Sequence, residues 1–144
     1  MLNPIVYHLL LIAVAAYAFL RGRSDERMAA AICVVATIAT RMVLSPTPDR
    51  YSGVETGVFL VDLLTLAGFV AIAVRTDRFW PLWVAGLQLT TLVAHLLKAV
   101  DVSLLPHAYA AAGRFWVYPI FLIIVIGTRR SHQRALRERH AGTA

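Results

Sequence analysis

Long apolar runs dominate this sequence and constrain what it can fold into. Five of them, each about 20 residues long and so able to cross a bilayer, are separated by short charged or proline-containing segments. They cover residues 4–20, 28–45, 57–74, 79–100 and 106–128. Apolar residues make up 59% of the chain, against about 45–50% in an ordinary soluble domain. We therefore predict an all-α polytopic membrane protein, with a five-transmembrane-helix bundle over residues 1–128 and a basic cytoplasmic tail over 129–144.

The fifth run is the least regular of the five. Its purely apolar part, 115–127, is too short to span hydrocarbon, so the helix is expected to start near Pro106 and to draw Arg114 into the membrane. Pro119 is expected to kink it. The tail carries five arginines and two histidines. We expect it to be frayed and to lie on an anionic lipid surface.

The basic residues predict the orientation of the bundle. Arg21 and Arg23 follow the first run and no positive residue precedes it, which is the reverse of a secretory signal peptide. With the N-terminus outside, ten basic residues fall on the inner side, and Arg41, Arg50, Lys98 and Arg114 on the outer half. This bias follows the positive-inside rule. The preference for arginine over lysine indicates a GC-rich bacterial genome, so we expect a multi-pass protein of the bacterial cytoplasmic (inner) membrane.

The fourth run carries a polar stripe in an otherwise apolar helix. Gln88, Thr91, His95, Lys98 and Asp101 follow one another at gaps of about three or four residues, which places them on or near one helix face. Polar groups that face lipid are costly. This face is therefore expected to point at other helices or at a water-filled cavity.

One ionisable residue of each run is expected at a similar depth. A rise of about 1.5 Å per residue places His8, Arg41, Asp62, His95 and Arg114 roughly 6–12 Å below the outer boundary. We predict that they converge on one polar site, to which Gln88, Thr91 and Lys98 also contribute. Two arginines against one aspartate would favour an anionic ligand, such as a phosphate, a carboxylate or a lipid headgroup.

The same residues also have a purely structural interpretation. Asp62 would pair with Arg41 or Arg114 and fix the helix register, while Arg41, Arg114 and Lys98 would extend their charges to the interface. Threonines such as Thr91 commonly hydrogen-bond between membrane helices.

A weak internal repeat relates the first two runs to the next two. At an offset of about 54 residues, Arg21 aligns with Arg75 and Thr37 with Thr91. His8 then falls on Asp62, and Arg41 falls on His95. We interpret this as a duplicated helical hairpin followed by a fifth helix, an internal symmetry that small transporters often show.

The function classes that fit are limited. We favour an accessory or structural subunit of a membrane assembly, with an outward-facing anion or lipid-headgroup binding or transport module as the first alternative. A b-type haem protein ligated by His8 and His95 is a second alternative. An enzyme is less favoured, because HExxH, GxSxG and Gly-rich phosphate-loop motifs are absent.

The expected partners follow from the same features. They are the lipid bilayer, other membrane subunits or further copies of the chain, and a small anion or lipid headgroup. Nucleic acid is not expected, because the basic residues flank membrane spans. No cofactor is favoured, and the lone Cys33 provides neither a disulfide nor a metal motif.

Overall fold

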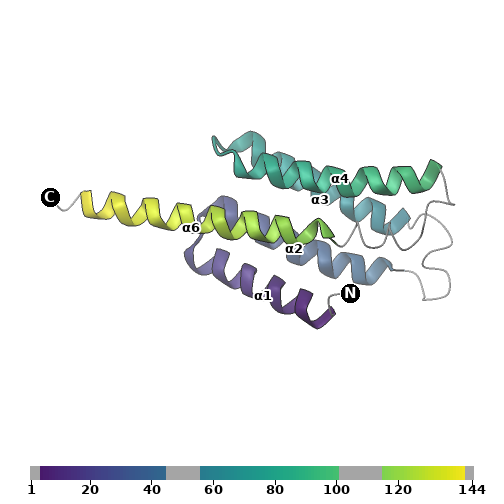
Figure 1. Ribbon diagram of the computed structural model, residues 1–144, viewed down its shortest axis with the longest axis horizontal. Coiled ribbons are helices and arrows are strands. Elements are labelled where there is room, and N and C mark those ends of the chain that lie inside the picture. Colours follow the sequence, from purple (N-terminus) through teal and green to yellow (C-terminus); the bar gives the residue numbers. More distant parts are fainter. Residues whose placement is uncertain (1–3, 45–55, 101–114, 142–144) are drawn as a thin grey trace.

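The fold is a helical bundle in which each described helix runs opposite to the one before it in the chain (Figure 1). The computed structural model describes residues 4–44, 56–97 and 115–141, together with the backbone of 98–100. Within these ranges all regular secondary structure is helical. The helices are α1 (Pro4–Arg21), α2 (Ser24–Val43), α3 (Thr56–Arg75), α4 (Trp80–Val100) and α6 (Val117–Ala141).

Two hairpins and one long helix form the bundle (Figure 1). α1 and α2 form the first hairpin and α3 and α4 the second, with α2 packed on α3. α6 lies alongside and contacts α1, α2 and α4, so it joins the two hairpins. We call the end with the turns at 22–23 and 76–79 the turn end, and the opposite end the open end. The C-terminal part of α6 projects past the turn end.

Small and apolar side chains let the helices pack closely. Ala18 of α1 and Ala29 and Ala30 of α2 are buried at the first hairpin, where small residues allow two backbones to approach. Larger apolar side chains of α3, α4 and α6 complete the core. The buried ones are Phe69, Ile72, Val84, Ile120, Phe121 and Ile124.

The outer surface of the bundle is strongly apolar. Met42, Leu20 and Val74 are 80%, 79% and 76% exposed. A soluble monomer rarely exposes large contiguous apolar patches, so such a surface indicates contact with lipid or with another protein. Within the described ranges, three helices are long and apolar enough to cross a membrane: Pro4–Arg21, Thr56–Arg75 and Trp80–Leu97. These features support a membrane protein, whereas five crossings and their orientation are still predictions.

The helix bounds differ from those expected at two places. α2 begins at Ser24 rather than near residue 28, because its first turn carries charges that are bonded to neighbouring elements. α6 continues without a break to Ala141, so residues 129–141 form a helix and not the expected frayed tail. The expected start of this helix, near Pro106, lies outside the described residues.

Candidate functional site

Gln88 and His95, two members of the polar stripe of α4, bond to α3, in agreement with the expectation that the stripe points at other helices or at a cavity. Gln88 and Thr91 are buried, and the side chain of His95 is 12% exposed. The His95 ring also makes an edge-on contact with Phe59 of α3, with the ring centroids 6.3 Å apart. Polar groups of α4 are thereby kept from lipid by the neighbouring helix.

Asp62 of α3 is the acceptor at the centre of this face. Its Oδ2 accepts a hydrogen bond from His95 Nε2 at 2.9 Å, and its Oδ1 accepts one from Gln88 Nε2 at 3.0 Å. The two donors lie about two turns apart on α4 and hold both carboxylate oxygens from one side. Asp62 is therefore paired with His95 and Gln88, and Arg41, one of its two expected partners, bonds to His8 instead. Arg114, the other expected partner, lies outside the described residues.

The first hairpin carries its own polar contacts. Arg41 Nη2 donates to His8 Nε2 at 2.9 Å, and His8 Nδ1 lies 2.6 Å from the carbonyl oxygen of Pro4. Because arginine only donates and a carbonyl only accepts, this arrangement requires a neutral His8 with its hydrogen on Nδ1. Deeper in the hairpin, Tyr7 Oη and Thr37 Oγ1 share a hydrogen bond of 2.7 Å.

The two hairpins place these bonds at positions that the repeat relates. His8–Arg41 and Asp62–His95 both join residues 33 apart, across α1–α2 and α3–α4. The offset of about 54 residues converts one pair into the other, so the alignment of these positions agrees with the structure. The chemistry of the two pairs differs. In the first hairpin an arginine donates to a neutral histidine, and in the second a histidine donates to a carboxylate.

The sequence-predicted residues therefore fall into two sets. The hydrogen bonds join His8 to Arg41 within the first hairpin, and Asp62 to Gln88 and His95 within the second. Thr91 is buried beside the second set. Arg114 and the side chain of Lys98 lie outside the described residues. The convergence of all eight on one site is thus neither shown nor refuted.

The hydrogen bonds of His8 and His95 bear on the alternative of a haem held by these two histidines. Ligation through Nε2, one of the two ring nitrogens that can bind a metal, would need the lone pair of that nitrogen. In this fold Nε2 of His8 is already the acceptor for Arg41, and Nε2 of His95 is the donor to Asp62. Both rings would have to give up these bonds.

A second polar cluster, at the turn end, was not anticipated. Glu26 of α2 is fully buried, and its Oε1 accepts hydrogen bonds from Arg78 Nη1 and Ser131 Oγ, both at 2.6 Å. Its Oε2 accepts from the backbone N–H of Arg23 at 2.9 Å, which caps the start of α2. The cluster joins α2, the α3–α4 turn and α6 through one carboxylate.

Further contacts extend this cluster along α6. Arg21 Nη1 donates to His132 Nε2 at 2.8 Å, and Arg23 pairs with Glu138 at 3.4 Å. Thr76 Oγ1 donates to Asp25 at 3.0 Å. Glu26 and Ser131 are 0% and 1% exposed, so the bond between them lies in the interior of the bundle.

One sequence signal could have found this cluster. Glu26 stands three residues after Arg23 at the start of an apolar run, which is the acidic half of a helix-capping arrangement. The contacts of Ser131 and His132 had no such signal, since each is a single polar residue in a basic segment.

Comparison of the chain with protein-family models, with curated proteins and with solved structures gave no match.

Proposed function

We propose that the protein is a small accessory or structural subunit of a bacterial membrane assembly, whose polar residues near the open end hold its helices together. The pairing of Asp62 is the observation that carries this proposal. Both carboxylate oxygens of Asp62 accept hydrogen bonds from side chains of α4, which is the arrangement that interhelical adhesion requires.

The energetic argument favours this use of Asp62. A charged side chain within a membrane helix costs on the order of 2.5–3.5 kcal/mol on insertion scales. Two hydrogen bonds between helices offset part of this cost, at about 0.6 kcal/mol on average and up to about 1.7 kcal/mol each. A charged side chain such as Asp62 is retained in a membrane helix where its hydrogen bonds set the relative position of two helices.

The exposed apolar surface supports a role within an assembly. It includes large apolar side chains of all five described helices. A surface of this kind is covered by lipid, by other membrane subunits or by a second copy of the chain.

A double-mutant cycle tests the structural role of the pair. We expect Asp62→Ala and His95→Ala each to lower the unfolding free energy in detergent by about 1–2 kcal/mol, and the double variant to lose less than the sum. The coupling is measured by thermal unfolding of the full chain. Additive losses would show that the two side chains do not stabilise each other.

The anion-site alternative predicts a different result in the same assay. If Arg41 holds an anion at the open end, phosphate should stabilise the wild type, and Arg41→Gln should abolish that effect. A structural role predicts that Arg41→Gln leaves any effect of phosphate unchanged.

The accessory role itself is tested in the membrane of origin. We expect the tagged chain, released with mild detergent, to migrate on a native gel at a mass well above that of the purified chain alone. Migration at the mass of the isolated chain would oppose the proposal.

A further inference from the structure

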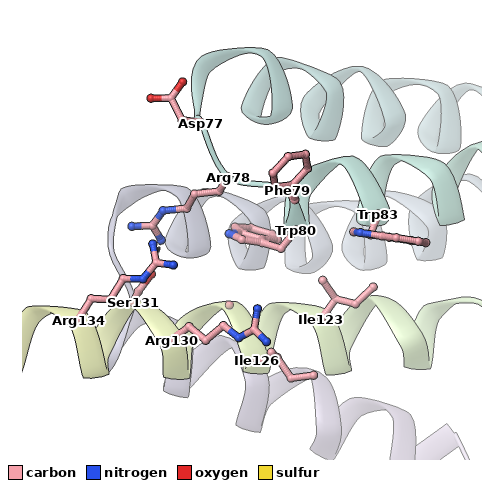
Figure 2. Close-up of a pocket in the computed structure, with 11 residues that line it drawn as sticks. Asp77, Arg78, Phe79, Trp80, Trp83, Ile123, Ile126, Arg130, Ser131 and Arg134 are labelled. Atoms are coloured by element: carbon pink, nitrogen blue, oxygen red, sulfur yellow. Dashed lines mark hydrogen bonds between the residues drawn. The ribbon is translucent and has the colours of Figure 1, made fainter.

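A basic and aromatic pocket lies at the turn end, away from the polar layer. It has a volume of about 480 Å³ and lies between the start of α4 and the middle of α6. Figure 2 shows arginines along one side and aromatic rings of α4 along the other. A volume of this size falls within the range of small-molecule sites.

Three arginines give the pocket its charge. Arg78 comes from the α3–α4 turn, and Arg130 and Arg134 come from successive turns of α6. Asp77 also lines the pocket, but its carboxylate points away from the three guanidinium groups (Figure 2). The pocket therefore presents an excess of positive charge.

The arginines differ in how they are held. Arg78 is fixed by its bonds to Glu26 and Ser131. Arg130 and Arg134 have no carboxylate partner in the described part of the chain. Like charges four residues apart on a helix repel each other. An anion between them would remove this repulsion, and guanidinium groups bind phosphate oxygens in bidentate fashion.

The other wall of the pocket suits a lipid. Phe79 and Trp83 are 78% and 69% exposed beside the arginines, as aromatic residues at a membrane interface are. Ile123 and Ile126 of α6 continue the apolar wall toward the bundle. The indole N–H of Trp80, also on this wall, is buried without an acceptor among the described residues. Buried donors of this kind usually have a partner.

We propose that this pocket binds the phosphate group of an anionic phospholipid, with Arg130 and Arg134 on the phosphate and Trp83 and the isoleucines along the acyl chains. Basic pockets beside membrane helices on the cytoplasmic side are known to bind such headgroups. The inference does not depend on the proposed accessory function, because it uses residues at the opposite end of the bundle.

The test titrates the full-length protein in detergent with phosphatidylglycerol, and with phosphatidylcholine as the neutral lipid, with bound lipid counted by native mass spectrometry. We expect phosphatidylglycerol to bind the wild type, and the double variant Arg130→Gln/Arg134→Gln to bind it about tenfold more weakly or worse. The matched control Arg129→Gln/Arg137→Gln removes the same charge from exposed positions of α6 outside this pocket. It should bind within about threefold of the wild type.

Each outcome bears on the proposal. Equal losses of lipid affinity in the two double variants would overturn the proposal, because binding would then follow the net charge of the protein. No loss of affinity in either variant would also overturn it, because the lipid would then bind at another surface. Thermal unfolding without lipid checks that both variants fold.

Competition by inorganic phosphate tests whether the pocket binds a free phosphate anion or the headgroup of a lipid. If phosphate alone competes fully and Trp83→Ala has no effect, the site stands as one for a free anion. If phosphate competes weakly and Trp83→Ala weakens lipid binding, a lipid headgroup is the ligand. Loss of lipid binding leaves the Asp62–His95 coupling unaffected, so the two proposals fail separately.

Discussion

Glu26 and Asp62 are both carboxylates in the bundle, but their surroundings differ. Glu26 is completely buried and accepts a charged bond from Arg78, whose side chain is 20% exposed. Asp62 is 19% exposed and bonded to an imidazole and an amide. Removing one partner of a buried ion pair leaves an uncompensated charge. Glu26 is therefore expected to matter more for stability.

Glu26→Ala should destabilise the fold strongly. The substitution leaves Arg78 and Ser131 without their acceptor and removes the cap on the Arg23 N–H. We expect a loss of about 3–5 kcal/mol in unfolding free energy, measured by thermal unfolding in detergent.

Glu138→Ala is the matched control for this prediction. It removes a carboxylate from an ion pair with Arg23 in which the two side chains are 66% and 50% exposed. Exposed pairs contribute about 0–1 kcal/mol. Similar losses in the two variants would show that the Glu26 cluster does not hold the turn end together.

At residue scale the sequence could predict only contacts that follow from helical spacing. Gln88 and His95 were expected on one face because a periodic pattern places them there, and both do bond to α3. The partner of Asp62 was not predictable. Which side chain on a neighbouring helix meets it depends on the relative height of the two helices, and local spacing says nothing of that height.

At the scale of the elements, the sequence predicted the long apolar helices to within a few residues. Their ends at Arg21 and Arg75 are marked by charges next to apolar runs. The start of α2 and the extent of α6 were harder. Charged residues usually end a membrane helix, but here Glu26 and Ser131 bond to each other, so both helices continue through their charged segments.

The α1–α2 turn depends on Gly22, because neighbouring atoms leave no room for a side chain at this position. A Cβ on Gly22 would overlap the carbonyl oxygen of Ala18 and lie 2.9 Å from Cβ of Glu26. Gly22→Ala must therefore shift the backbone of the turn. We expect a loss of about 1–3 kcal/mol, as for overpacked positions.

Gly86→Ala makes the same substitution where there is room. A Cβ on Gly86 of α4 would meet nothing within 4 Å. Alanine is favoured over glycine in a helix by about 1 kcal/mol, so this variant should be unchanged or slightly more stable. Unfolding curves for the two variants should move in opposite directions. A loss in Gly86→Ala equal to that in Gly22→Ala would contradict the account of the turn.

At the scale of the whole molecule, the open question is whether α2 crosses the membrane. α1, α3 and α4 satisfy the length and hydropathy requirement by themselves. The acidic residues of α2, Asp25 and Glu26, lie in its first turn, where Thr76 and Arg78 bond to them. From Met28 to Thr40 the helix carries no charged residue. Since α2 runs antiparallel to both α1 and α3, we expect it to cross (Figure 1).

Cysteine labelling tests this crossing and the orientation together. In a Cys33→Ala background, a membrane-impermeant maleimide should label Ser52→Cys in intact cells, and label Ser24→Cys and Asp77→Cys only after permeabilisation. Ser52 lies outside the described residues and belongs to the expected outer loop. Ser24 and Asp77 are exposed at the turn end.

The labelling pattern separates the topologies because Ser24 and Ser52 flank α2. If α2 crosses, the two positions react on opposite sides of the membrane. If both react on the same side, α2 does not cross, and Asp62 and His95 would lie on the other side from the one expected. If the cysteines at positions 24 and 77 were labelled in intact cells and the one at position 52 were protected, the bundle would have the opposite orientation in the membrane. The phosphate pocket would then face the outer leaflet, so this measurement also decides which leaflet can supply its lipid.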